Sequence, residues 1–183
     1  MPISLVHSQR PFAPNWRSYK RPLAHKVPRQ WQAWLNDSGS LTQRLIQASG
    51  GAFEVRVVRN YWHTPRRSEA RALAMKGRQK AIIREVELLC HGQVWVCARS
   101  IMPHSTLTGR LRRFSNIGTK PLGALLFKHP NMVRGSLQVA CFKSRHSSLQ
   151  HWARRSVFYL DDKGILVTEV FMPPMAQLKP PAV

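Results

Sequence analysis

The chain has 183 residues, 43% of them hydrophobic, which is enough for one globular domain with a sizeable core. Its 29 Lys and Arg against 8 Asp and Glu give a formal net charge of +21, a balance typical of proteins that bind nucleic acid or acidic membranes. The cations are spread through the whole chain, however, without a zinc finger or an aromatic RNA-binding motif. We therefore interpret them as a solvated basic surface and expect no stable nucleic-acid partner.

The composition also argues against a membrane-spanning protein and against a metal-binding protein. No apolar stretch is long enough for a membrane helix, and the N-terminus lacks the apolar region of a signal peptide. Cys90, Cys97 and Cys141 are odd in number and lack metal-ligand spacing, and the 8 histidines are scattered. These features predict reduced thiols in a cytoplasmic protein without a metal site.

The N-terminal part predicts an extension followed by two short helices. Residues 1–25 are rich in proline and cations and lack periodicity, so we expect a flexible basic extension before a single domain at residues 26–183. Trp31, Trp34 and Leu35 have helical spacing. Ser40-Leu41-Thr42-Gln43 is a capping-box pattern, and its helix should end at Gly50-Gly51.

The rest of the chain reads mainly as antiparallel strands. Alternating apolar residues predict strands at residues 53–61, 81–90, 94–102, 133–142, 153–160 and 164–172. A turn of helix is expected at residues 68–73, and a short helix with proline in its first turn at 120–127. The pattern predicts an α+β domain, with a single antiparallel sheet of about six strands flanked by short helices.

Two arginines stand out in the hairpin formed by residues 81–102. A two-residue loop at His91-Gly92 would place Arg84 directly opposite Arg99 on an apolar face. Like charges in that position destabilise a sheet, so an anion should lie between them. A three-residue loop would shift the register by one residue and remove this pairing.

The scarce acids single out Glu169. It shares a strand face with Ile165, Val167 and Phe171. This carboxylate is either the partner of a buried arginine, Arg84 or Arg99, in an internal salt bridge, or a site residue. A salt bridge leaves one arginine over, which favours an anionic small-molecule site.

Two helix starts add backbone donors to this set. Gly118-Thr119-Lys120-Pro121-Leu122-Gly123 and Ser40-Leu41 each place N–H groups at the beginning of a helix, where anions bind. Each alone is most simply an ordinary helix start. Together with two arginines and one carboxylate, they form a more specific combination.

Several of these segments resemble one family, the chorismate pyruvate-lyases. The resemblance runs from Trp31 to Pro174 and is carried, in order, by residues 83–90, 95–103, 118–123, 152–156 and 166–173. It implies an antiparallel sheet with an internal ligand cavity beneath helical flaps. It also implies a cofactor-free, monomeric lyase that converts chorismate into 4-hydroxybenzoate and pyruvate, the first committed step of bacterial ubiquinone synthesis.

The same resemblance implies roles for individual residues. Arg84 and the backbone N–H groups of Leu41 and Leu122 would hold the ligand carboxylate, and Glu169 would meet the phenolic oxygen. Arg99 matches a family arginine of the cavity and is assigned to the enolpyruvyl carboxylate of chorismate. The family more often has methionine in place of Leu41, the order Thr119-Lys120 is reversed here, and neither the high charge nor the basic extension is expected of it.

Two other function classes remain open at this point. The first is a non-catalytic module that binds aromatic carboxylates, like the effector domains of some bacterial transcription regulators. Those domains normally follow a winged helix, for which the first 30 residues are too short and too rich in proline. The second is a basic nucleic-acid-binding protein, which charge alone supports.

Overall fold

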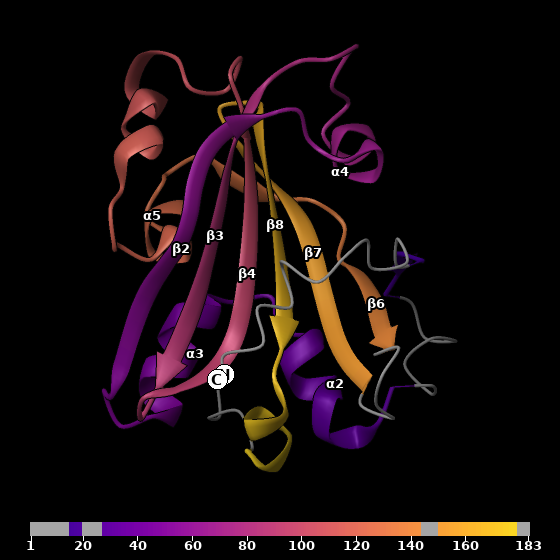
Figure 1. The fold of residues 1–183 in the computed structure, drawn as a ribbon, viewed down its shortest axis with the longest axis vertical. Helices are drawn as coiled ribbons and strands as arrows, with labels where there is room; N and C mark the ends of the chain where they lie inside the picture. Colours follow the sequence, from indigo (N-terminus) through magenta and orange to yellow (C-terminus); the bar gives the residue numbers. More distant parts are fainter. Residues whose placement is uncertain (1–14, 20–26, 144–149, 179–183) are drawn as a thin grey trace.

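The computed structural model describes residues 15–19, 27–143 and 150–178. They form an α+β fold built on one eight-stranded antiparallel sheet (Figure 1), with strand order β1-β6-β7-β8-β4-β3-β2 and β5 paired to β7. The predicted fold class is confirmed, but the sheet has eight strands rather than about six. The short β1 was not predicted, and the strand expected at residues 133–142 is divided into β5 and β6.

The strands are β1 (Arg17–Ser18), β2 (Phe53–His63), β3 (Ala81–Cys90), β4 (Gln93–Pro103), β5 (Met132–Arg134), β6 (Gln138–Lys143), β7 (Gln150–Leu160) and β8 (Lys163–Phe171). The α-helices are α2 (Arg29–Leu35), α3 (Leu41–Ala48), α4 (Arg67–Ala72) and α5 (Leu122–Phe127). Two 3-10 helices, η1 (Gly109–Asn116) and η2 (Pro173–Gln177), complete the described chain.

The helices predicted near Trp31, Leu41, Leu73 and Leu122 are all present. The Ser40 hydroxyl caps α3 by accepting a hydrogen bond from the Gln43 N–H at 3.5 Å. The connection after Pro103 contains η1, which periodicity did not reveal. Among the described residues, no helix is long and apolar enough to cross a membrane.

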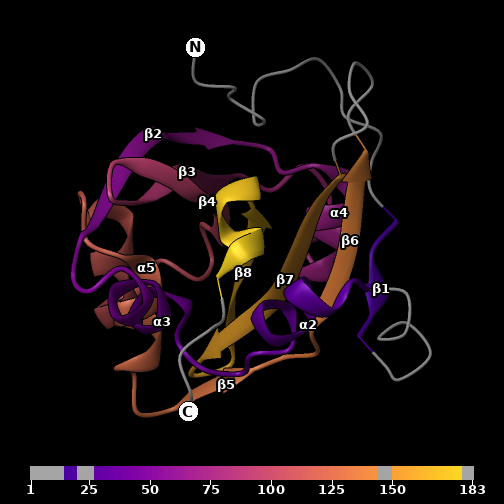
Figure 2. The ribbon, with the colours of Figure 1, turned by 90° about the horizontal axis from the view of Figure 1, so that it is seen from below.

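The sheet is curved, and its two faces carry different layers (Figure 2). Helices α3 and α5 lie within the curve beside β2, β3 and β4, and α2 lies beside β7. On that concave face, Val86, Leu88 and Ala98 belong to one apolar cluster with α2 and α3. On the opposite face, α4 and the segment after it pack on a smaller cluster that includes Ile83 and Ile101.

A β-bulge in β4 overturns the predicted pairing of Arg84 with Arg99. The hairpin begins as expected, with Cys90 opposite Gln93, but the register shifts between Leu88 and Leu89. As a result Arg84 lies opposite Ser100, and Arg99 lies opposite Glu85. The bulge has a packing reason: the consecutive residues Trp95 and Val96 are both buried in the same core cluster, which strict alternation forbids.

Of the predicted N-terminal extension, the structure describes only residues 15–19. Residues 1–14 and 20–26 lie outside the described residues. Within the described part, Arg17–Ser18 pairs with β6, and Trp16 packs edge-on against Phe142 with ring centroids 6.2 Å apart. The boundary at residue 25 therefore stays a prediction.

Candidate functional site

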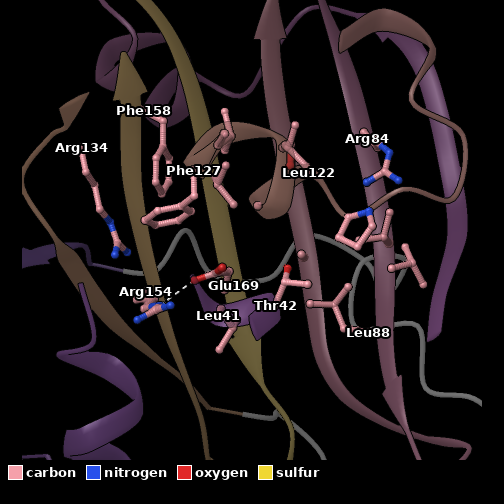
Figure 3. Close-up of a pocket in the computed structure, with 18 of the residues that line it drawn as sticks. Leu41, Thr42, Arg84, Leu88, Leu122, Phe127, Arg134, Arg154, Phe158 and Glu169 are labelled. Atoms are coloured by element: carbon pink, nitrogen blue, oxygen red, sulfur yellow. Dashed lines mark hydrogen bonds and ion pairs between the residues drawn. The ribbon is translucent and has the colours of Figure 1, made fainter. Parts of the chain in front are cut away.

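A pocket lies between the concave face of the sheet and helices α3 and α5 (Figure 3). Residues of β2, β3, β4, β5, β7 and β8 contribute to its wall. The empty volume of the pocket is about 550 Å³. Arg84, Leu41, Leu122 and Glu169, which the sequence singles out, all line this pocket. Side chains such as Leu88, Phe127 and Phe158 make the rest of the wall largely apolar.

Arg84 is a buried cation at one end of the pocket. It lies on β3 and is only 2% exposed, because strand alternation turns it inward with Val86 and Leu88. Its Nη2 donates to the carbonyl oxygens of Gly118 at 2.8 Å and Lys120 at 3.3 Å. Burial lowers the pKa of the guanidinium. Among the described residues it has no carboxylate partner, so its charge suits an anionic ligand.

Glu169 is held by an arginine that the sequence analysis did not select. Arg154, on the neighbouring strand β7, is the cross-strand partner of Glu169 and donates from Nε to its Oε2 at 2.6 Å. Arg154 is 1% exposed and also donates from Nη1 to the carbonyls of Trp34 and Asp37, each at 2.8 Å. Of the two alternatives for Glu169, an internal salt bridge is thus present, but its partner is Arg154 rather than Arg84 or Arg99, and Glu169 also lines the pocket.

A third arginine, Arg134, lies beside this ion pair. It belongs to β5, and it donates from Nε to the Ser156 hydroxyl at 3.1 Å and from Nη1 to the Asp37 carbonyl at 3.0 Å. Its guanidinium lies 5.1 Å from the centroid of the Phe158 ring. Burial, and then the positive charge of Arg154, lower the pKa of Arg134. Figure 3 shows Arg134 and Arg154 together at the end of the pocket opposite Arg84.

Only a weak sequence signal marks these two arginines. Arg154 alternates with Ser156 and Phe158 along one face of β7, as Glu169 does with its apolar neighbours in β8. A pattern of this kind within a predicted strand could have identified Arg154. Arg134 lies on a strand of three residues, which is too short for alternation to show a face.

The two helix starts meet at the pocket. Helix α3 begins at Leu41 and α5 begins at Leu122, where the first N–H groups have no partner within the helix. The two helices lie close together here: a Cβ atom added to Gly123 would lie only 3.1 Å from the Thr42 hydroxyl oxygen. Both helix ends are therefore held at the same wall of the cavity.

Arg99 lies outside this pocket, on the opposite face of the sheet. Its Nε and Nη2 donate to Glu69 of α4, at 2.7 and 3.2 Å, and its Nη1 donates to Glu85. The predicted place of Arg99 in the cavity with Arg84 is wrong, because the bulge in β4 turns every later residue of that strand to the other face. Arg99 instead joins α4 to the sheet.

Comparison with known proteins agrees with the motifs. The family model described as chorismate lyase matches residues 16–178. The chain belongs to the chorismate lyase family. A relative from Marinobacter nauticus, named probable chorismate pyruvate-lyase, is 40% identical over 144 residues, covering 79% of this chain and 77% of the relative. Another of the same name from Aromatoleum aromaticum is 36% identical, covering 92% of this chain and 97% of the relative.

The fold of this chorismate lyase family member is similar to that of solved structures with low sequence identity. PhnF from Mycobacterium smegmatis matches with a TM-score of 0.55 at 16% identity, over 76% of this chain and 66% of PhnF. The effector domain of the same PhnF matches with a TM-score of 0.53 at 15% identity, over 74% of this chain and 90% of the domain. At such identities the likeness concerns the fold alone.

The segments that resemble the chorismate lyase family form a large part of the pocket wall. They contribute Arg84, Leu122, Arg154 and Glu169 to its lining. In the part of the chain that the structure describes, no group of three or more His, Cys, Asp or Glu side chains is arranged to hold a metal ion.

Proposed function

We propose that this protein is a chorismate pyruvate-lyase, which eliminates pyruvate from chorismate and releases 4-hydroxybenzoate. Within the cell we place it in the cytoplasm, at the first committed step of ubiquinone biosynthesis. One observation carries the proposal: in a chain of this family, a single pocket has cations at both ends and an inward carboxylate between them.

The charges of the pocket fit a dianion. Chorismate has a ring carboxylate and, on the enolpyruvyl ether, a second carboxylate beside the ring hydroxyl. We assign the ring carboxylate to Arg84, with the N–H groups of Leu41 and Leu122 as further donors. Glu169 accepts a hydrogen bond from the ring hydroxyl, which lies para to that carboxylate.

The enolpyruvyl carboxylate needs a cation near Glu169. Arg134 is suited to this role, because it lies beside the Arg154–Glu169 pair and its bonds to Ser156 and Asp37 use Nε and Nη1 rather than Nη2. We assign it this contact in place of Arg99, which faces the other side of the sheet. Arg154 is a positioning residue, because its contacts fix the orientation of the Glu169 carboxylate.

The reaction breaks the ether bond between the ring and the enolpyruvyl oxygen. The ring proton next to the departing group is lost, the ring becomes aromatic, and the enolpyruvate takes up a proton and leaves as pyruvate. Aromatisation makes the reaction strongly favourable without a cofactor. The protein therefore needs chiefly to orient the substrate and to stabilise the negative charge on the leaving group, for which Arg134 is placed.

A direct assay tests the proposal. Purified protein is mixed with chorismate in excess chelator, 4-hydroxybenzoate is followed by its absorbance, and pyruvate is measured in a coupled assay. We expect both products in equal amounts. Binding of 4-hydroxybenzoate without turnover of chorismate would instead identify a non-catalytic effector module. Activity that disappears with chelator and returns with a divalent metal would contradict the cofactor-free mechanism.

A further inference from the structure

The proposed reaction does not account for a concentration of cations at one end of the molecule. We define the basic end as residues 62–80, between the last residues of β2 and the start of β3, together with residues 103–113, which include η1. Its exposed cations are Arg66, Arg67, Arg71, Lys76, Arg78, Lys80, Arg110, Arg112 and Arg113. The one acid within these segments, Glu69, is buried in its ion pair with Arg99.

Contacts between strand ends place these segments side by side. Ala81 pairs with Pro103, and the His104 N–H donates to the Lys80 carbonyl at 3.1 Å. In Figure 1 the segments lie at the top of the view, away from α2 and η2. The β7–β8 turn contributes two acids nearby, Asp161 and Asp162, which are far fewer than the exposed cations of the two segments. The basic end therefore has a strong positive potential.

An exposed tryptophan accompanies these cations. Trp62 is 48% exposed at the end of β2, and its ring lies 5.7 Å from that of His104. On the same edge strand, Val58 is 36% exposed. An indole that is half buried and half solvated is a side chain favoured at the interface between water and lipid.

We propose that the basic end binds peripherally to the surface of bilayers that contain anionic phospholipids. The cations attract the lipid headgroups, and Trp62 inserts its ring at the headgroup level. A lipid surface fits better than nucleic acid, because the cations are distributed over two separate segments and an exposed tryptophan accompanies them. They do not follow one helix or strand that could enter a groove.

The experiment measures binding of the full chain to vesicles by co-sedimentation. One set of vesicles is phosphatidylcholine alone, and the other contains about one third phosphatidylglycerol. We expect binding only to the anionic vesicles, and we expect it to fall steeply as salt is raised. Equal binding to both sets, or no binding to either at low salt, would overturn the proposal.

Two matched double variants test the location. Arg67→Gln with Arg78→Gln removes two cations from the basic end, whereas Arg17→Gln with Arg29→Gln removes two exposed cations from β1 and α2. The first pair should weaken vesicle binding about 25-fold, at roughly 5-fold per cation, and the second should change it only slightly. Equal losses in the two pairs would show a diffuse charge effect and refute the assignment to this end.

A third variant tests the apolar contact, and a competitor tests the alternative partner. Trp62→Ser should weaken vesicle binding several-fold while leaving its salt dependence in place. A duplex DNA that displaces the protein from vesicles, and whose own binding is lost in Arg67→Gln with Arg78→Gln, would identify the basic end as a nucleic-acid surface and overturn the proposal. Solution turnover of chorismate should be unchanged in all these variants, because none of them lies in the pocket.

Discussion

At the scale of single residues, the buried arginines differ in what balances their charge. Arg99 has two carboxylates, and Arg154 has one carboxylate and two carbonyls. Among the described residues, Arg84 is balanced by two carbonyls and by no carboxylate. A buried charge is costly unless it is paired. An anion bound at Arg84 should therefore stabilise the folded protein more than an anion bound at Arg99 or Arg154 would.

Replacement of Arg84 should remove ligand binding without harming the empty protein. We expect Arg84→Met to abolish the rise in melting temperature that 4-hydroxybenzoate causes, because the carboxylate loses its cation. The ligand-free melting temperature should stay the same or rise, since an unbalanced buried charge is gone. Thermal melts with and without ligand measure both effects, with exposed Arg59→Met as the control. A ligand shift that survives in Arg84→Met would refute the assignment.

Glu169 should matter more for turnover than for stability. In Glu169→Gln, Arg154 keeps its two carbonyl acceptors, so we expect only a modest fall in melting temperature. Loss of the carboxylate that orients the ring hydroxyl should reduce kcat by about 100-fold or more. Steady-state kinetics and thermal melts separate the two effects, and exposed Glu54→Gln is the control. A variant with a much lower melting temperature but full turnover per folded molecule would show that the role of Glu169 is purely structural.

At the scale of elements, one inserted residue decides which side chains share a face. The hairpin loop is as short as expected, but the bulge near Trp95 shifts the register of the rest of β4 by one residue. Arg99 then meets Glu69, which places α4 against the convex face. The chain thus uses one arginine of the hairpin for its site and the other for holding a helix.

Replacement of Arg99 should destabilise the fold and spare the site. Arg99→Met leaves Glu69 and Glu85 buried without their cation, which costs about 3–5 kcal/mol and lowers the melting temperature on the order of 10 °C. The 4-hydroxybenzoate shift should remain. Arg56→Met is the matched control, because its ion pair with Glu87 is half exposed and should contribute at most about 1 kcal/mol. A higher melting temperature in Arg99→Met would restore the idea of two facing, repelling arginines.

At the scale of the whole molecule, the described residues 15–19 contact the rest of the chain, although they lie in the segment for which the sequence predicts an extension. Trp16 stacks on Arg155, with the guanidinium carbon 4.4 Å from the ring centroid, and the Tyr19 N–H donates to the Leu137 carbonyl at 3.0 Å. The family model also begins to match at residue 16. These contacts favour a domain boundary before residue 15, eleven residues earlier than the composition indicates.

Two truncations test this boundary. Deletion of residues 1–14 should leave kcat/KM and the melting temperature close to those of the full chain. Deletion of residues 1–19 should lower the melting temperature by several degrees, because Arg155 and Phe142 lose the aromatic ring that packs on them. If both truncations melt like the full chain, the boundary predicted at residue 25 is the better one.

The sequence by itself determined the local features of this protein. Caps and periodicity placed α2, α3 and α5, and alternation turned Arg84 and Glu169 inward, because these signals depend on neighbours within a few residues. The motifs that follow one another along the chain identified the family, which the comparisons confirm.

Only the tertiary structure decided which distant residues meet. The bulge in β4 is set by the burial of both Trp95 and Val96, a core requirement that the loop sequence does not contain, and it moved Arg99 to the other face. Arg154 and Arg134 reach the pocket because β8 pairs with β7 and β7 pairs with β5. Strand pairing is a cooperative property of the whole sheet, so the partners of a buried charge follow from the complete register rather than from any one segment.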